Sequence, residues 1–126
     1  MPKRQDIRQL GRTGENLAAK FLQKKGFRIL ERNFHAHGGE IDIVAAEGNF
    51  LVFVEVKTAY GAEAAPPVFR VTPQKQRRLG KAAQAYCVTR DVHEHDIRFD
   101  VVTVQFVHGK PVIEHIENAF WLEPDW

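Results

Sequence analysis

The sequence predicts one α/β domain in which a mixed β-sheet is flanked by helices. Two stretches carry apolar residues at helical spacing, one near the N-terminus and one after residue 72. Five short runs rich in β-branched and aromatic residues have the length and composition of strands. These elements follow one another in the order α-β-β-β-α-β-β. A helix that interrupts consecutive strands is typical of a sheet covered by helices.

The first element is an amphipathic helix over about residues 6–25. Its apolar positions recur on one helical face, while charged residues lie mostly off that face. Gly26 is well placed to end the helix. A strand is predicted over residues 27–34, because Phe27 and Ile29 alternate with Arg28, and a loop over residues 35–39.

Two apolar runs come next, at residues 40–46 and 50–57. They flank Gly48-Asn49, a pair typical of a hairpin turn. Residues 58–67 contain several small residues and a Pro-Pro pair and predict a loop. A second helix is predicted from Thr72 as N-cap and Pro73 as the first helical residue to about residue 88. Strands over residues 97–107 and 111–116 complete the sheet, the last as an edge strand because it begins with proline.

Length and composition narrow the class of protein. The 126 residues fit a single domain over residues 1–126. One cysteine excludes an internal disulfide and a cysteine-rich zinc site. No apolar stretch is long enough to span a membrane, and the basic N-terminus is not followed by the apolar core of a secretory signal. We therefore expect a cytoplasmic domain with no membrane association.

The net charge of +2 conceals a block pattern. Residues 1–37 carry nine Lys and Arg against three Asp and Glu, and residues 70–90 carry six against none. Between them, residues 38–69 carry five acids and one lysine. Basic elements on both sides of an acidic centre are suited to holding a polyanion near carboxylates. Ordinary solvated helix faces explain the charges equally well.

The predicted hairpin places three charged residues together. A turn at Gly48-Asn49 sets Asp42 directly opposite Glu55, and opposite residues share one face of the sheet. Lys57 follows Glu55 by two residues and projects from the same face, while Ile41 and Ile43 are expected on the other. Two facing carboxylates repel each other unless a cation lies between them. Carboxylate oxygens suit Mg²⁺ or Mn²⁺.

Other readings of the charged residues remain open. Lys57 also fits a purely structural role, as a salt bridge between Asp42 and Glu55. Glu40 is expected at a turn or on the surface. His35 and His37 are candidate phosphate contacts, whereas the histidines between residues 93 and 96 fit a solvated loop better than a metal cluster. Four basic residues of the second helix are candidate contacts to nucleic-acid phosphates or a solvated face: Lys75, Arg77, Arg78 and Lys81.

Two segments of the hairpin resemble the PD-(D/E)xK nuclease signature. They are Gly39-Glu40-Ile41-Asp42 and Phe53-Val54-Glu55-Val56-Lys57. Residues 14–18, 75–78 and 98–102 resemble the uncharacterised bacterial YraN family. That family is similar to archaeal Holliday-junction resolvases and other restriction-endonuclease-like proteins. The resemblance implies an αβββαβ core, which agrees with the element order.

The resemblance also implies roles for individual residues. Asp42 and Glu55 would ligate Mg²⁺ or Mn²⁺ with the Val56 carbonyl, Lys57 would act on the attacking water, and Glu15 would complete the acidic cluster. The sequence departs from the signature at Ile41, which stands where the motif has proline. The similarity to resolvases further implies a homodimer.

The expected function is hydrolysis of phosphodiester bonds in nucleic acid, with DNA favoured over RNA and a structured or branched substrate over a specific sequence. The main alternative is a non-catalytic nucleic-acid-binding module that keeps the same fold. A weaker alternative is a protein-interaction adaptor that uses Trp121 and Trp126 near the C-terminus.

Overall fold

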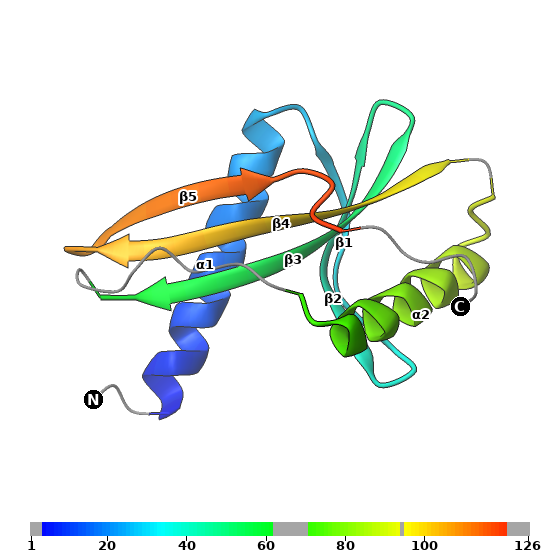
Figure 1. Cartoon of the computed structure of the whole chain (residues 1–126). Coiled ribbons are helices and arrows are strands. Elements are labelled where there is room, and N and C mark those ends of the chain that lie inside the picture. The colour runs from blue at the N-terminus through cyan, green and yellow to red at the C-terminus, as the bar shows by residue number, and fades with distance from the viewer. Residues whose placement is uncertain (1–3, 62–70, 94, 121–126) are drawn as a thin grey trace.

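The computed structural model describes residues 4–61, 71–93 and 95–120, with side chains from residue 12 onward. Two helices and five strands make up the fold (Figure 1). In chain order these are α1 (Arg4–Lys24), β1 (Arg28–Ala36), β2 (Gly39–Glu47), β3 (Phe50–Tyr60), α2 (Pro73–Thr89), β4 (Asp96–Val107) and β5 (Lys110–Ile116). The predicted element order is confirmed. Trp121 and Trp126 lie outside the described residues.

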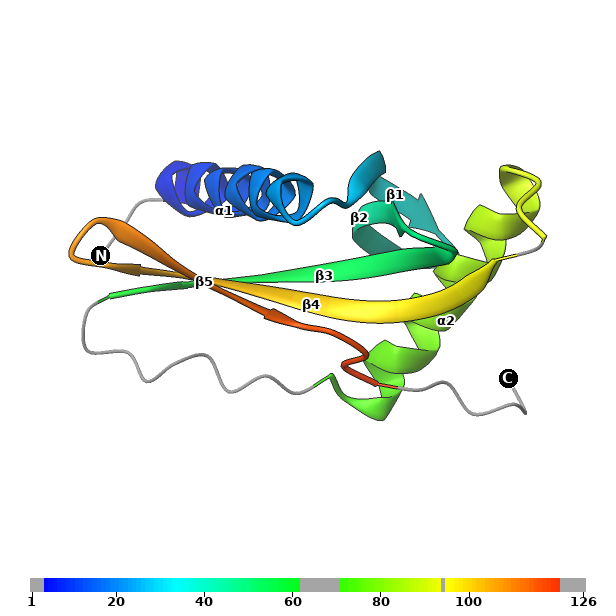
Figure 2. The same cartoon turned by 90° about the horizontal axis from the view of Figure 1, so that it is seen from above.

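The strands form one mixed sheet in the order β1-β2-β3-β4-β5. Neighbouring strands are antiparallel except β3 and β4, which are parallel along their whole length. Parallel neighbours need a crossover connection, and α2 lies within that connection. Figure 2 shows α1 along one face of the sheet and α2 against the other, at the end where β1 and β2 lie. The structure is consistent with a restriction-endonuclease-like αβββαβ core, as predicted.

Each helix covers its own apolar core. On one face, Ala18 and Leu22 of α1 pack against the strands, in a cluster completed by Ala19, Phe27, Ile43, Ala45, Val52, Val54, Val102 and Val104. On the other face, α2 buries the residues that its spacing predicts: Leu79, Ala82, Ala83 and Tyr86. Phe53 and Phe99 lie under them, with stacked rings 5.6 Å apart. The stretch Leu51–Glu55 of the central strand β3 is therefore buried, whichever face each side chain points to.

Two predicted loops are shorter in the structure. Residues 35–39 were expected as a loop, but β1 and β2 leave only His37 and Gly38 between them. Both residues have left-handed φ values, 53° and 74°, as a tight two-residue hairpin turn requires. Likewise, β3 continues to Tyr60, because parallel pairing with β4 extends to Phe106.

Within the described residues, no helix combines the length and apolarity needed to cross a bilayer.

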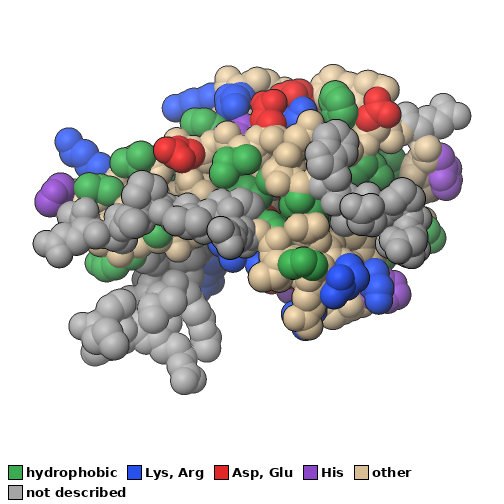
Figure 3. Space-filling model, viewed as in Figure 1, with side chains coloured by type: hydrophobic (Ala, Val, Ile, Leu, Met, Phe, Trp, Pro, Cys, Tyr) green, Lys and Arg blue, Asp and Glu red, His purple; other side chains and the backbone are tan. Residues whose placement is uncertain are grey.

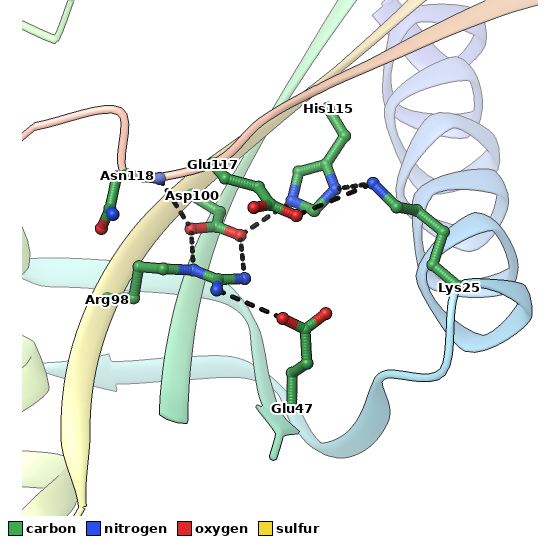
Figure 4. Close-up of polar contacts among 7 residues, drawn as sticks. All are labelled: Lys25, Glu47, Arg98, Asp100, His115, Glu117 and Asn118. Carbon is green, nitrogen blue, oxygen red and sulfur yellow. Dashed lines mark hydrogen bonds and ion pairs between the residues drawn. The ribbon is translucent and has the colours of Figure 1, made fainter. Parts of the chain in front are cut away.

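A buried polar network joins β4 and β5 to the C-terminal end of α1 (Figure 4). Asp100 accepts hydrogen bonds from Arg98 at 2.8 and 2.9 Å and contacts His115 at 2.8 Å. The other ring nitrogen of His115 lies 2.7 Å from Lys25 Nζ, and Arg98 also reaches Glu47. Every buried side-chain polar atom among the described residues has a partner. The sequence resemblance singled out residues 98–102, and the network gives Arg98 and Asp100 a structural role.

Candidate metal and nucleic-acid site

The pairing of β2 with β3 has the predicted register. Glu47 pairs with Phe50, and pairing continues without a shift to Ile43 and Val54. Asp42 and Glu55 occupy the next position in this register, beyond the last paired residues. There the Asp42 carboxylate accepts a hydrogen bond from the backbone N–H of Val56, with Oδ2 at 2.8 Å. The carboxylate thus replaces a strand–strand hydrogen bond at the point where β2 leaves β3.

The expectation for Ile41 is wrong. Ile43 packs in the α1-side core, but Ile41 packs in the α2-side core. The cause lies in β1, where Asn33 has a left-handed φ of 56° between the pairs that Arg32 and Phe34 make with β2. The two strands turn over at this point, so residues on either side of Asp42 face opposite cores. Asp42 therefore lies at a local bend of the hairpin rather than in a regular strand.

Glu55 and Lys57 share a face, as predicted, and a second lysine joins them. Lys57 Nζ lies 3.9 Å from Glu55 Oε1, and Lys75 Nζ of α2 lies 2.5 Å from the same oxygen. Glu55 is only 8% exposed. Among the described residues, no ion pair joins Lys57 to Asp42. Lys57 therefore does not form the bridge between the two acids that the structural alternative expected. Glu55 is held instead by two lysines from different elements.

Burial and neighbouring charges shift the pKa values of Asp42 and Lys57. Burial and the neighbouring charge of Glu55 raise the pKa of Asp42 to about 7, against a smaller lowering by the Val56 N–H. The charges of Glu15 and Glu40 act in the same direction as burial. Burial and the nearby Lys75 ammonium lower the pKa of Lys57. A partly buried carboxylate with a raised pKa beside a lysine with a lowered one is typical of functional sites.

The donor set fits a hard divalent cation. Asp42 and Glu55 offer carboxylate oxygens, and repulsion between them is the kind that a cation relieves. In the described part of the chain, no three His, Cys, Asp or Glu side chains gather into a metal-binding group. Mg²⁺ suits a site with few protein ligands, since it keeps several waters and is often held by one or two carboxylates. The residues present therefore fit Mg²⁺ or Mn²⁺ better than a metal that needs a full protein cage.

Glu15 lies near the site but is engaged elsewhere. Its Oε1 accepts hydrogen bonds from Arg32 at 2.9 and 3.1 Å and from the Asn33 side chain at 3.0 Å. Helix α1 approaches β3 so closely here that a Cβ on Gly14 would collide with Thr58 Oγ1. A glycine next to Glu15 is thus what allows α1 to bring this acid toward Asp42.

Comparison with known proteins decides the family. A model described as the uncharacterised protein family UPF0102 matches residues 14–104. A UPF0102 protein of Geobacter metallireducens is 46% identical over 115 residues, covering 91% of this chain and 94% of the relative. The chain belongs to the UPF0102 family. Two further UPF0102 proteins, from Geobacter sulfurreducens and Pelobacter propionicus, are 47% and 48% identical over 90% and 94% of the chain, covering 89% and 87% of their own lengths. The predicted YraN membership is confirmed.

The UPF0102 match spans the predicted basic residues of α2, and the structure separates them into two groups. Arg77, Arg78 and Lys81 are exposed, and we call these three residues the basic row. Lys75 instead points at Glu55. In Figure 3 blue side chains lie over α2, while the red side chains on this face lie toward the opposite margin. The basic row is thus exposed on the helix whose first turn carries Lys75.

The histidines discussed from the sequence lie at exposed positions. His35 and His37 are exposed at the β1–β2 turn, where His35 lies 3.7 Å from Glu40. His93 contacts Asp91, and His95 and Asp96 are exposed, while residue 94 lies outside the described part. Three site features of this UPF0102 chain had no signal in the sequence. These are the contact of Lys75 with Glu55, the hold of Arg32 on Glu15, and the bend at Asn33.

Proposed function

We propose that this UPF0102 protein is a divalent-metal-dependent nuclease that hydrolyses phosphodiester bonds in DNA, structured or branched DNA above all. The observation that carries the proposal is the apposition of Asp42 and Glu55 at the edge of the β2–β3 pairing, with two lysines against Glu55. Opposed acids beside lysines, next to an exposed basic helix face, are the chemistry that phosphodiester hydrolysis needs.

Each residue has a proposed part. Asp42, Glu55 and the Val56 carbonyl would hold Mg²⁺ or Mn²⁺, which supplies Lewis-acid polarisation of the phosphate when bound. Lys57 projects from the same face as Glu55 and would orient the attacking water or stabilise charge on the phosphate. Its pKa is lowered by burial, which favours exchange of a proton with that water. Glu15, fixed by Arg32, would add negative charge near Asp42 rather than a free ligand.

The basic row would position the phosphate backbone. Guanidinium and ammonium contacts to phosphates fix orientation without reading base identity. Nucleic acid is therefore the proposed partner, with shape rather than sequence as the feature recognised. We also propose action in the cytoplasm and, from the resemblance to resolvases, a homodimer that sedimentation velocity would detect.

One observation favours the non-catalytic alternative. Glu55 is already neutralised by Lys75 and Lys57, so this part of the cluster is electrostatically satisfied without a metal. Under that alternative the protein binds nucleic acid through its basic row. Binding would weaken with salt in proportion to the number of phosphate contacts and would not respond to Mn²⁺.

The test is a cleavage panel. Branched, flapped, single-stranded and duplex DNA, with matched RNA, are incubated with Mn²⁺ and wild-type protein, Asp42→Asn, Lys57→Ala or Glu40→Gln. Glu40 is the control acid, because it lies two residues from Asp42 but is 46% exposed on its side chain. We expect cleavage by wild type and Glu40→Gln and its loss in the other two variants. Undiminished cleavage by both Asp42→Asn and Lys57→Ala would refute the assignment of this site. Metal-independent DNA binding without cleavage would favour the non-catalytic binding module.

A further inference from the structure

The ammonium group of Lys75 lies against the Glu55 carboxylate, where a bound metal cation would also lie. Its Nζ is 2.5 Å from Glu55 Oε1, much closer than Lys57 Nζ at 3.9 Å. The lysine reaches this oxygen from a different element, 20 residues along the chain. Glu55 is nearly buried, whereas the Lys75 side chain remains 39% exposed. The pair therefore joins a fixed carboxylate to an ammonium group that has room to move.

The backbone of Lys75 is fixed by the start of α2. Thr72 is the N-cap, and its hydroxyl accepts a hydrogen bond from the Lys75 N–H at 3.2 Å. Gln76 closes the same turn by donating to the Val71 carbonyl at 2.9 Å. These contacts hold the Cα of Lys75 beside the site whichever way its side chain points. Any movement of Nζ is thus a rotation about side-chain bonds that needs no change in the fold.

A divalent cation and this ammonium group compete for the negative charge of one carboxylate. An oxygen that accepts a short charge-assisted bond from Lys75 has its charge already engaged. A metal ion on the same carboxylate would also repel a positive group only a few ångströms away. Metal binding to Glu55 therefore favours departure of Lys75 from the carboxylate. Once free, its nearest attractive partner is an anionic ligand at the site, beside the N-terminus of α2, which favours negative charge.

We propose that Lys75 is a displaceable counter-ion: it holds Glu55 until a divalent cation takes its place, and it then contacts a phosphate of the nucleic acid. This inference rests on the proposed function and adds that metal binding and nucleic-acid binding are coupled. Because the cation frees Lys75 for phosphate, and phosphate keeps Lys75 away from Glu55, each ligand strengthens binding of the other. The lysine would thus link metal loading to substrate binding.

Metal affinity tests the first half of the proposal. Mn²⁺ is titrated calorimetrically, without DNA, into wild type, Lys75→Met, Lys75→Gln and Lys81→Met. Lys81 is the matched control, an exposed lysine on the same helix. We expect both Lys75 variants to bind Mn²⁺ roughly 2–10-fold more tightly than wild type, since a partly exposed ion pair is no longer broken. Lys81→Met should match wild type. Equal or weaker Mn²⁺ binding by the Lys75 variants overturns the proposal.

DNA affinity tests the second half. Lys57→Ala, which should bind without cutting, is compared with Lys57→Ala/Lys75→Met in Mn²⁺ and in EDTA. We expect Lys75→Met to weaken binding and to reduce the salt slope by about one in Mn²⁺ only. An equal effect in EDTA, or none in Mn²⁺, refutes release of Lys75 to phosphate. If wild type and the Lys75 variants bind Mn²⁺ with equal affinity, this inference is refuted while the proposed function stands. If neither wild type nor any variant binds Mn²⁺, the proposed function is refuted as well.

Discussion

Replacing Asp42 by asparagine should stabilise the metal-free protein at neutral and alkaline pH. Burial and the charge of Glu55 raise the pKa of Asp42 from 3.8 to about 7. The folded state therefore binds a proton that the unfolded state releases, over the interval between these two values. Stability from this group is fully present below about pH 4 and is lost as the pH rises through 7. Asparagine has no charge to bury, and its oxygen can still accept the Val56 N–H.

The size of the effect follows from the shift. A difference of about three pKa units corresponds to roughly 4 kcal/mol at 1.36 kcal/mol per unit. Because Asp42 is only partly buried, solvent screening should reduce this gain, and we expect about 1–3 kcal/mol. If the Asp42 carboxylate stabilised the fold, its removal would lower the free energy of unfolding instead. The sign of the change therefore distinguishes a carboxylate that destabilises the metal-free protein from one that stabilises it.

Urea unfolding in EDTA measures this gain at pH 8 and at pH 4.5. Asp42→Asn should be more stable than wild type at pH 8 and should exceed it by a much smaller margin at pH 4.5. Glu40→Gln, the exposed control, should change stability by less than about 0.5 kcal/mol. Saturating Mn²⁺ should reverse the order at pH 8, because only wild type binds it. An Asp42→Asn protein less stable than wild type at pH 8, or a difference that does not vary with pH, would refute the reasoning.

Three further predictions concern the fold and the nucleic-acid surface. Gly14→Ala should cost about 1–3 kcal/mol, because its Cβ would collide with Thr58, and Thr58→Ala in the same chain should recover most of the loss in urea unfolding. His115→Ala should lower the free energy of unfolding by about 2–4 kcal/mol, since it leaves the buried Asp100 short of a partner, without changing Mn²⁺ affinity measured by calorimetry. Alanine at all three positions of the basic row should weaken DNA binding at every sequence and reduce the salt slope by about three, measured by fluorescence anisotropy, with Mn²⁺ binding unaltered.

The sequence is informative where the physics is local. The Gly48-Asn49 turn fixes the register of β2 and β3 by chain geometry, so the positions of Asp42, Glu55 and Lys57 follow from counting. The N-cap at Thr72 is equally local. Apolar spacing identifies the buried face of α2 for the same reason, since a helix of fixed pitch has one such face.

Features that depend on packing between distant elements could not be predicted. Nothing in the spacing of Lys75 indicates that α2 lies with its first turn on Glu55, so this lysine reads as one more exposed base. A single left-handed residue, Asn33, turns the hairpin over and moves Ile41 to the other core. A role for Glu15 in the site was implied only by the resemblance. Its partner Arg32 lies in β1, and no local sequence pattern indicates how α1 packs against that strand.

The most direct test of the metal site is the number of Mn²⁺ ions bound by wild type, Glu55→Ala and Glu40→Gln. We expect calorimetry in the absence of DNA to show binding to wild type and to the Glu40→Gln control, and no binding to Glu55→Ala. Binding that survives in Glu55→Ala, or an absence of binding in wild type, would contradict the assignment of Asp42 and Glu55 as a metal centre.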